Sequence, residues 1–350
     1  MEPAQGKNLG DVWYALSGQE RRTVVSNLVQ LESRLFSLRF PASRSLSRSF
    51  WIGPDTSLAL WHGKRLGLSV ERGPYQDSLA VLTASTTKEI TYLKRFGRAL
   101  RPFQRLSREV YNYQAQSHLD HIMNLKRYLQ ITPRLTPHDC PALHRPALRH
   151  PDLQPNNIFI SDELEIKSQH STVLPLFLQY GIPKSLQNYG DEVSESLQIP
   201  RLPSNFDQLE EMQQFQQAEL FRRRQLHYFY VKMTAYMNIE HYNALTYEYS
   251  TLRRRLFQHT TDPWEGDNVT LKADLVTLTR EWREFSRDSK DACPIQFSDN
   301  ESTECIQLAG AQSEACEQLQ YRLVRMRLEL GMKVGSLSHD ITRQRRARES

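Results

Sequence analysis

The stretch His150-Pro-Asp-Leu-Gln-Pro-Asn-Asn-Ile-Phe-Ile160 says more about fold and function than the rest of this 350-residue chain. Its polar half holds Asp152 and Asn157, and His150 stands two positions before the aspartate. Phosphoryl transfer requires a carboxylate that accepts the proton of an attacking hydroxyl, and an amide oxygen nearby that ligates the metal ion beside the phosphates. The spacing of Asp152 and Asn157 therefore predicts a catalytic loop. The apolar Ile-Phe-Ile run predicts a strand that leaves this loop.

The context of the loop adds weight, because the short pattern alone also fits a surface loop rich in Pro and Asn. A second β-prone run, Leu164 to Ile166, follows a polar turn at Ser161-Asp162-Glu163. The two runs predict a hairpin directly after the loop.

Several longer segments resemble the fungal aminoglycoside-phosphotransferase-like proteins, a protein-kinase-like family. The most similar group is the one named altered inheritance of mitochondria protein nine. The segments that resemble it are Ile52-Gly-Pro-Asp55, Arg72-Gly-Pro-Tyr75, Phe103-Gln-Arg-Leu106, Arg149 to Phe159, Leu174 to Pro183 and Gln187-Asn-Tyr-Gly-Asp191. The resemblance covers most of residues 1 to 260.

The resemblance implies a fold, an activity and a set of roles. The fold is mainly α-helical with small β hairpins, the C-terminal lobe of a kinase-type enzyme. The activity is transfer of the γ-phosphoryl group of ATP to a small hydroxyl-bearing molecule of unknown identity. Asp152 is then the catalytic base, His150 braces the catalytic loop, and Asn157 holds Mg²⁺ on the ATP. The family also implies a mitochondrial location.

The chain departs from the family in two places. The family carries an Ile-Asp-Trp strand after the hairpin, and its aspartate is the second metal ligand. Here the chain continues as Lys167-Ser-Gln-His170, so we expect that strand and its carboxylate to be missing. The segment Met1 to Gly6 resembles the connection between the two kinase lobes, so we expect no N-terminal lobe, no Gly-rich loop and no phosphate-binding lysine.

Two functional classes stay open. One is an active phosphotransferase that uses Asp152 and Asn157. The other is a catalytically impaired relative, or a pseudokinase that acts as an interaction protein in mitochondrial inheritance. The departures favour impaired catalysis and weak binding of Mg·ATP.

Composition excludes several other classes. The net charge of +5 is mild, and its Arg clusters lie in helical patterns, so we expect no nucleic-acid partner. No apolar run is long enough to span a membrane. The N-terminus lacks a targeting pattern, which indicates a cytoplasmic location if that terminus is the natural one. The four cysteines form no zinc or redox motif, and the histidines form no HExxH pair. Ser171 and Cys140 have no visible catalytic partner.

Periodicity and capping signals predict the rest of the fold as helices. A capping box begins a helix at Ser17, another helix ends at Gly97, and Ser117 caps a third whose Leu119, Ile122 and Leu125 face inward. Further helices are expected at 207–237, 240–258, 270–286 and 313–330. We expect one lobe at 1–260, with an irregular insertion at 41–82 pinned to the core by Trp51 and Trp61. A helical extension with a disordered basic tail follows at 261–350. Exposed apolar side chains near Val12 and Trp13 are expected to cause self-association.

Overall fold

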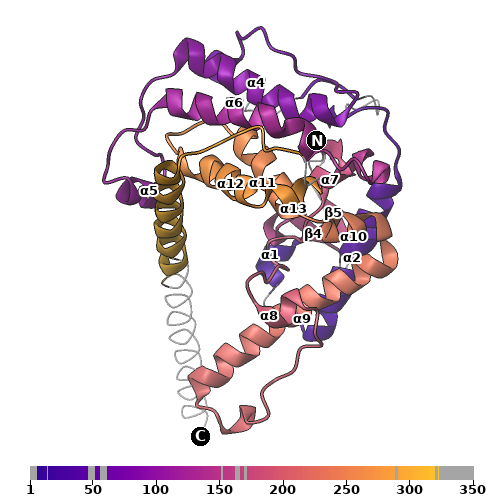
Figure 1. Cartoon of the computed structure of the whole chain (residues 1–350). Coiled ribbons are helices and arrows are strands. Elements are labelled where there is room, and N and C mark those ends of the chain that lie inside the picture. The colour runs from indigo at the N-terminus through magenta and orange to yellow at the C-terminus, as the bar shows by residue number, and fades with distance from the viewer. Residues whose placement is uncertain are drawn as a thin grey trace, which may run out of the picture.

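The computed structural model describes residues 6–13, 15–45, 52–55, 61–150, 153–161, 166–168, 172–287, 291–319 and 322. Asp152, Trp51, Ser171 and the basic tail lie outside these residues, so the predictions made for them remain predictions. The described chain is mainly helical with two small antiparallel sheets, which confirms that part of the expected fold class (Figure 1).

The helices and strands follow one another along the chain with short connections. The helices are α1 (Leu9–Val12), α2 (Gly18–Ser37), α4 (Ser78–Phe96), α5 (Arg105–Val110), α6 (His118–Leu135), α7 (Leu176–Gln179), α8 (Glu192–Glu195), α9 (Glu211–Met237), α10 (Ile239–Thr246), α11 (Ser250–Thr261), α12 (Val269–Arg280) and α13 (Trp282–Ser286), and residues 299–319 form a further helix. The strands are β1 (Lys7–Asn8), β2 (Arg44–Ser45), β3 (Pro146–Arg149), β4 (Ile158–Ile160), β5 (Ile166–Ser168) and β6 (Thr172–Pro175).

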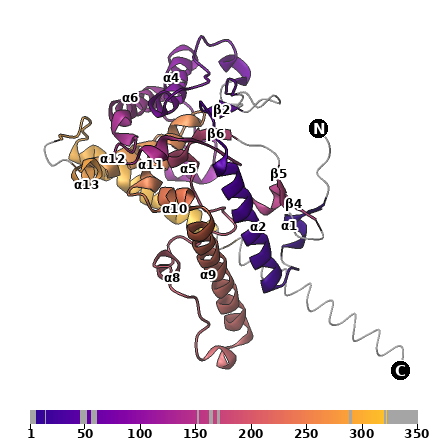
Figure 2. The same ribbon diagram turned by 90° about the vertical axis from the view of Figure 1, so that its right-hand side faces the viewer.

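The buried apolar side chains form two cores. The larger one lies among α4, α6, α7, α11, α12 and α13, with Leu125, Leu256 and Leu275 fully enclosed. The smaller one lies among α1, α2, β4 and α9, with Val25, Ile158 and Tyr230 at its centre. Figure 2 shows α2 running alongside α9, and the Ser33 hydroxyl of α2 donates to the carbonyl of Met237 at 2.7 Å.

Each sheet belongs to one of these cores. In the first, β4 pairs with both β1 and β5, with Ile160 opposite Lys7 on one side and Ile166 on the other. This arrangement confirms a hairpin after residue 157. In the second, β6 pairs with β2 and β3, and Leu148 of β3 lies opposite Val173. The segment between β3 and β4 therefore crosses from one core to the other.

Helix starts follow the capping signals in the sequence. The Ser17 side chain accepts a hydrogen bond from the amide of Glu20, whose carboxylate accepts one from the amide of Ser17, so the capping box is confirmed. Ser117 caps α6, and Gly97 ends α4 as expected. Ile122 and Leu125 are buried, but Leu119 is 60% exposed, so its inward prediction was wrong.

The C-terminal half divides into more helices than its periodicity indicates. The span predicted as one helix at 240–258 breaks at Tyr249, which has a left-handed backbone (φ 54°) and separates α10 from α11. The predicted helix at 270–286 is α12 followed by α13. The predicted long helix at 207–237 is confirmed, beginning at Glu211. Because α12 and α13 contribute Leu275 and Trp282 to the larger core, the segment after residue 260 packs with the segment before it.

Two predictions about tryptophan side chains were wrong: Trp61 was expected to pin the insertion to the core, and Trp13 was expected to be exposed. Trp61 is 37% exposed and contacts its own insertion: its indole donates to the carbonyl of Asp55 and stacks under the guanidinium of Arg72 at 4.4 Å. Trp13 is only 5% exposed, because it packs into the smaller core beside Leu9. Trp13 therefore does not contribute the exposed apolar surface that we expected near it.

Candidate functional site

The predicted catalytic loop lies between strands β3 and β4. Residues 155–157 form a 3-10 turn in which the amide of Asn157 donates to the carbonyl of Gln154 at 2.8 Å. The turn packs on α1: the Asn8 side chain donates to the carbonyl of Asn156 at 2.7 Å, and a Cβ on Gly10 would lie 1.9 Å from Oδ1 of Asn156. A side chain at residue 10 would therefore displace the Asn156 side chain from its place against α1.

A buried ion pair fixes the start of the loop. Arg149, the last residue of β3, donates through Nε to the Glu32 carboxylate at 2.8 Å. It also donates to the carbonyls of Gln179 at 2.8 Å and Gly181 at 2.5 Å. The Tyr230 hydroxyl completes the cluster by donating to Glu32 at 2.6 Å. Arg149 thus joins β3 to α2, α9 and the segment after α7, directly before His150.

The ionisation of this cluster follows from burial and charge. Burial lowers the pKa of the Arg149 guanidinium, but the Glu32 carboxylate and Tyr230 outweigh it, and the pKa ends above its ordinary value. Burial and the same carboxylate raise the pKa of Tyr230 well above its ordinary value. Burial, followed by the charge of Arg149, lowers the pKa of His241 well below its usual value. His241 is therefore a neutral imidazole, and its Nε2 accepts from the amide of Gly181 at 3.2 Å.

A cleft of about 570 Å³, called here the loop cleft, opens beside this cluster. His150, which is 5% exposed, and Leu153 contribute to its wall from the loop. The opposite wall comes from the segment after α7 and from the C-terminal end of α11, including Arg254, His259 and Asp262. Asn157 is half-buried and is not among the described residues that line the cleft. The structure thus brings His150, but not Asn157, to this cleft.

Two cations of the loop cleft form no ion pair within the described part of the chain. Lys184 is exposed, and Arg254 donates through Nη1 to the carbonyl of Tyr180 at 2.7 Å. Gly181 makes room for that guanidinium: its φ is +144°, and a Cβ there would lie 2.2 Å from Nη1 of Arg254. Lys184 and Arg254 therefore bring positive charge to the cleft, whereas the charge of Arg149 is compensated by Glu32.

The described residues do not form a set of Mg²⁺ ligands. No cluster of three or more His, Cys, Asp or Glu among them could hold a metal ion. The second strand of the hairpin, β5, reads Ile166-Lys-Ser168 and has no carboxylate. Mg²⁺ requires oxygen ligands that usually include carboxylates. Among the described residues of the loop and hairpin, only Asn157 was predicted to be a ligand, and its oxygen belongs to an amide.

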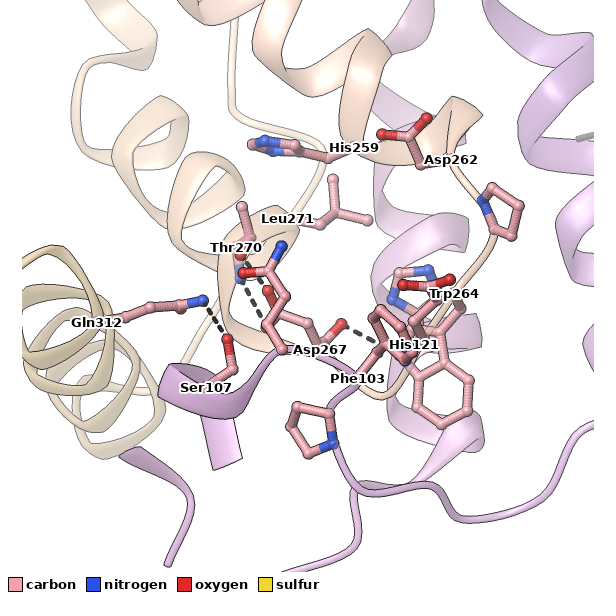
Figure 3. A pocket seen from close by; sticks show the side chains of 14 residues that line it. Phe103, Ser107, His121, His259, Asp262, Trp264, Asp267, Thr270, Leu271 and Gln312 are labelled. Atoms are coloured by element: carbon pink, nitrogen blue, oxygen red, sulfur yellow. Dashed lines mark hydrogen bonds between the residues drawn. The ribbon is translucent and has the colours of Figure 1, made fainter. Parts of the chain in front are cut away.

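A second pocket of about 270 Å³, called here the His121 pocket, has His259 and Asp262 in common with the loop cleft. Figure 3 shows the side chains that line it. Its walls come from α5, α6, the 262–271 segment and the helix at 299–319. In Figure 3 the Gln312 side chain of that last helix reaches Ser107 of α5, a hydrogen bond of 3.0 Å. His259 and Asp262 line both cavities and so form a wall that the two sites share.

Sequence reasoning missed the Arg149 cluster and the His121 pocket, although each leaves a signal. An arginine that ends the apolar run Pro146-Ala-Leu-Arg149 indicates a charged group carried into the core. His121 occupies the same helical face as Leu125 and Tyr128, which are both fully buried. Its partners come from residue 264 onward, and helical periodicity cannot predict such a contact.

Comparison with known proteins identifies relatives but no family. The chain is 28% identical to the subtelomeric hrmA-associated cluster proteins of two Aspergillus fumigatus strains, Af293 and CEA10, over 96% of its own length and 74% of theirs. No family model matches the chain. No solved structure matches it either. Within the described residues, no helix has the length and apolar character needed to cross a membrane.

Proposed function

We propose that this chain is a phosphotransferase-like protein that binds a small hydroxyl-bearing molecule in the loop cleft, with phosphoryl transfer impaired. The observation that carries this proposal is the position of the cleft. It opens directly beside the segment that begins with His150, and its volume of about 570 Å³ suits a small molecule.

The charges of the cleft favour one kind of hydroxyl compound. Arg254 and Lys184 line it without ion pairs among the described residues, while Asp262 is the only described carboxylate in its wall. A guanidinium and an ammonium bind carboxylates and phosphates through charge-assisted hydrogen bonds. A sugar acid or a phosphorylated polyol therefore suits this cleft better than an amino sugar.

The proposed catalytic roles stay with the loop. Asp152 would accept the proton of the acceptor hydroxyl, and Asn157 would hold Mg²⁺ on ATP, the phosphoryl donor in the resembling family. Kinase-type catalysis depends on several charge-stabilising groups acting together, and loss of one costs roughly 10²–10³ in rate. Since the sequence Lys167-Ser-Gln-His170 has no carboxylate where the resembling family carries its second metal ligand, we expect little turnover.

A non-catalytic binding protein is the second candidate. It is favoured by the same strand, which has no carboxylate, and by the described residues, which form no metal cluster. Such a protein keeps the cleft and its ligand but has no need of Asp152. A role in mitochondrial inheritance belongs to this second candidate.

Calorimetric titration with Mg·ATP and an ATPase assay test the two candidates. We expect weak binding, and hydrolysis that is the same in the wild-type chain, in Asp152→Ala and in the control Asp207→Asn. Micromolar affinity together with hydrolysis that Asp152→Ala abolishes would show an active enzyme. The cleft is tested separately by the melting temperature with gluconate, glucosamine or myo-inositol. Gluconate should raise it most, and Arg254→Met should remove that effect.

A further inference from the structure

The His121 pocket is built around a buried imidazole with no hydrogen-bond partner. His121 is 4% exposed, and both of its ring nitrogens lack a partner within the described structure. Its ring stacks on the indole of Trp264, with centroids 5.9 Å apart and planes 24° apart. Burial of polar nitrogens without partners is costly, so such a group indicates a missing ligand or water molecule.

The aromatic wall beside His121 is held in place by hydrogen bonds. The indole of Trp264 donates to the Asn268 side chain at 2.9 Å. The backbone amide of Trp264 donates to the Glu89 carboxylate at 3.0 Å. Phe103 stands at the mouth of the pocket, where its side chain is 71% exposed. Its amide donates to the carbonyl of Glu265 at 3.0 Å. The pocket thus offers one buried aromatic ring held by hydrogen bonds and one exposed aromatic ring (Figure 3).

The charges of the pocket are negative. Asp262, Glu265 and Asp267 line it, and no Lys or Arg is among its described lining residues. Burial lowers the pKa of His121, and likewise that of His259, to about 4, so both imidazoles are neutral at pH 7. Asp267 is held by the hydroxyls of Tyr111 and Thr270. Asp262 and Glu265 form no ion pair in the described chain.

We propose that the His121 pocket is a binding site for a small organic molecule that carries a primary ammonium group. A neutral imidazole has one acceptor nitrogen and one N–H donor, so His121 accepts a hydrogen bond from the ammonium group. The carboxylates compensate the charge of the ammonium group. The alkyl or ring portion of the ligand lies against Phe103, and the face of that ring also attracts the nearby cation. The volume of about 270 Å³ limits the ligand to a small amine.

This site is separate from the proposed phosphotransferase function. No residue of the 150–157 loop is among the described residues that line it, and it shares only His259 and Asp262 with the loop cleft. The pocket binds amines whether or not the loop is catalytic, so its test does not depend on phosphoryl transfer.

Isothermal titration with 1,5-diaminopentane and 1,5-pentanediol tests the proposal, because the two probes differ mainly in charge. We expect the diamine to bind the full chain at least roughly tenfold more tightly than the diol, since charge-assisted hydrogen bonds exceed neutral ones. Glu265→Gln and Asp262→Asn should each weaken diamine binding about fivefold. Asp207→Asn, which removes a carboxylate outside the pocket, should leave the affinity unchanged.

The His121→Phe variant keeps a ring in place and removes both nitrogens, so it should weaken diamine binding and reduce, but not abolish, the preference for the diamine that the carboxylates supply. If this variant does not fold, the two carboxylate variants still decide, because their side chains lie at the exposed mouth of the pocket. Equal affinities for diamine and diol would overturn the proposal. Diamine binding that neither carboxylate substitution weakens would overturn it as well.

Discussion

The loop cleft and the His121 pocket share one wall but have opposite charge. His259 and Asp262 line both cavities, yet beyond them the cleft presents Arg254 and Lys184, whereas the pocket presents Glu265 and Asp267. The cleft is fixed by a buried ion pair, and the pocket by a buried neutral imidazole and a stacked indole. A single fold can therefore hold two sites of opposite preference, because each takes its charge from different residues of the chain.

The largest expected effect is on the cleft. Arg149→Met removes the partner of the buried Glu32 carboxylate, which is 1% exposed. We expect the free energy of unfolding to fall by about 3–5 kcal/mol, because an unpaired buried charge remains. Urea denaturation of the wild-type chain and the variant measures this loss. The double variant Arg149→Met/Glu32→Gln should recover part of the loss, and a single variant that costs less than about 1 kcal/mol would show that the pair does not hold the cleft.

The next effect is on the pocket, through pH. The pKa values of His121 and His259 are lowered to about 4, so the unfolded chain binds protons near pH 6.5 while the folded chain does not. Stability is therefore fully present above pH 6.5 and is lost as the pH falls toward 4. Between pH 6.5 and pH 5 each histidine should lower the free energy of unfolding by about 1.5 kcal/mol. The His121→Gln variant should lose about that much less over the same range in urea denaturation, and an equal loss would contradict the assignment.

A smaller effect is expected at Gly181, where Arg254 meets the chain. Gly181→Ala places a side chain at a φ of +144° and displaces the guanidinium of Arg254. We expect a loss of about 1–2 kcal/mol in the free energy of unfolding. Gly190→Ala is a matched control, since its φ is +79° but a Cβ there meets nothing within 4 Å. If both variants lose the same amount, the strain is backbone strain alone and Arg254 does not depend on Gly181.

The smallest effect concerns the helix at 299–319. Gln312→Ala removes the hydrogen bond of 3.0 Å to Ser107 at the edge of the His121 pocket. We expect the free energy of unfolding to fall by about 0.5–1 kcal/mol. Diamine affinity should change with it if this helix closes the pocket. A change in stability without any change in affinity would show that the helix only supports the fold.

Local signals predicted the parts of the fold that depend on neighbouring residues. The capping box at Ser17, the cap at Ser117 and the helix end at Gly97 need only a few residues of sequence, and all three are confirmed. The break at Tyr249 was missed because Tyr rarely adopts a left-handed backbone, so its side-chain type gives no signal of one.

The site was predictable only in part, for the same physical reason. The motif indicated a loop and a hairpin, and the structure has a turn and a hairpin there. It could not indicate that Arg149 pairs with Glu32 or that His121 stacks on Trp264, because those contacts join distant segments through burial. Apolar periodicity specifies which face of a helix is buried, not which residue meets it there.

The loop connects the two hydrophobic cores, so it should respond to the local unfolding of each core. Ala147 of β3 belongs to the larger core, whereas Leu153 and Ile158 belong to the smaller one. Each core can act as a separate cooperative unit in native-state hydrogen exchange, with its own opening free energy. The amides of 153–160 then exchange with the smaller unit and those of β3 with the larger. Arg149 joins the two units through its hydrogen bonds. The loop cleft therefore keeps its walls only while both units are folded.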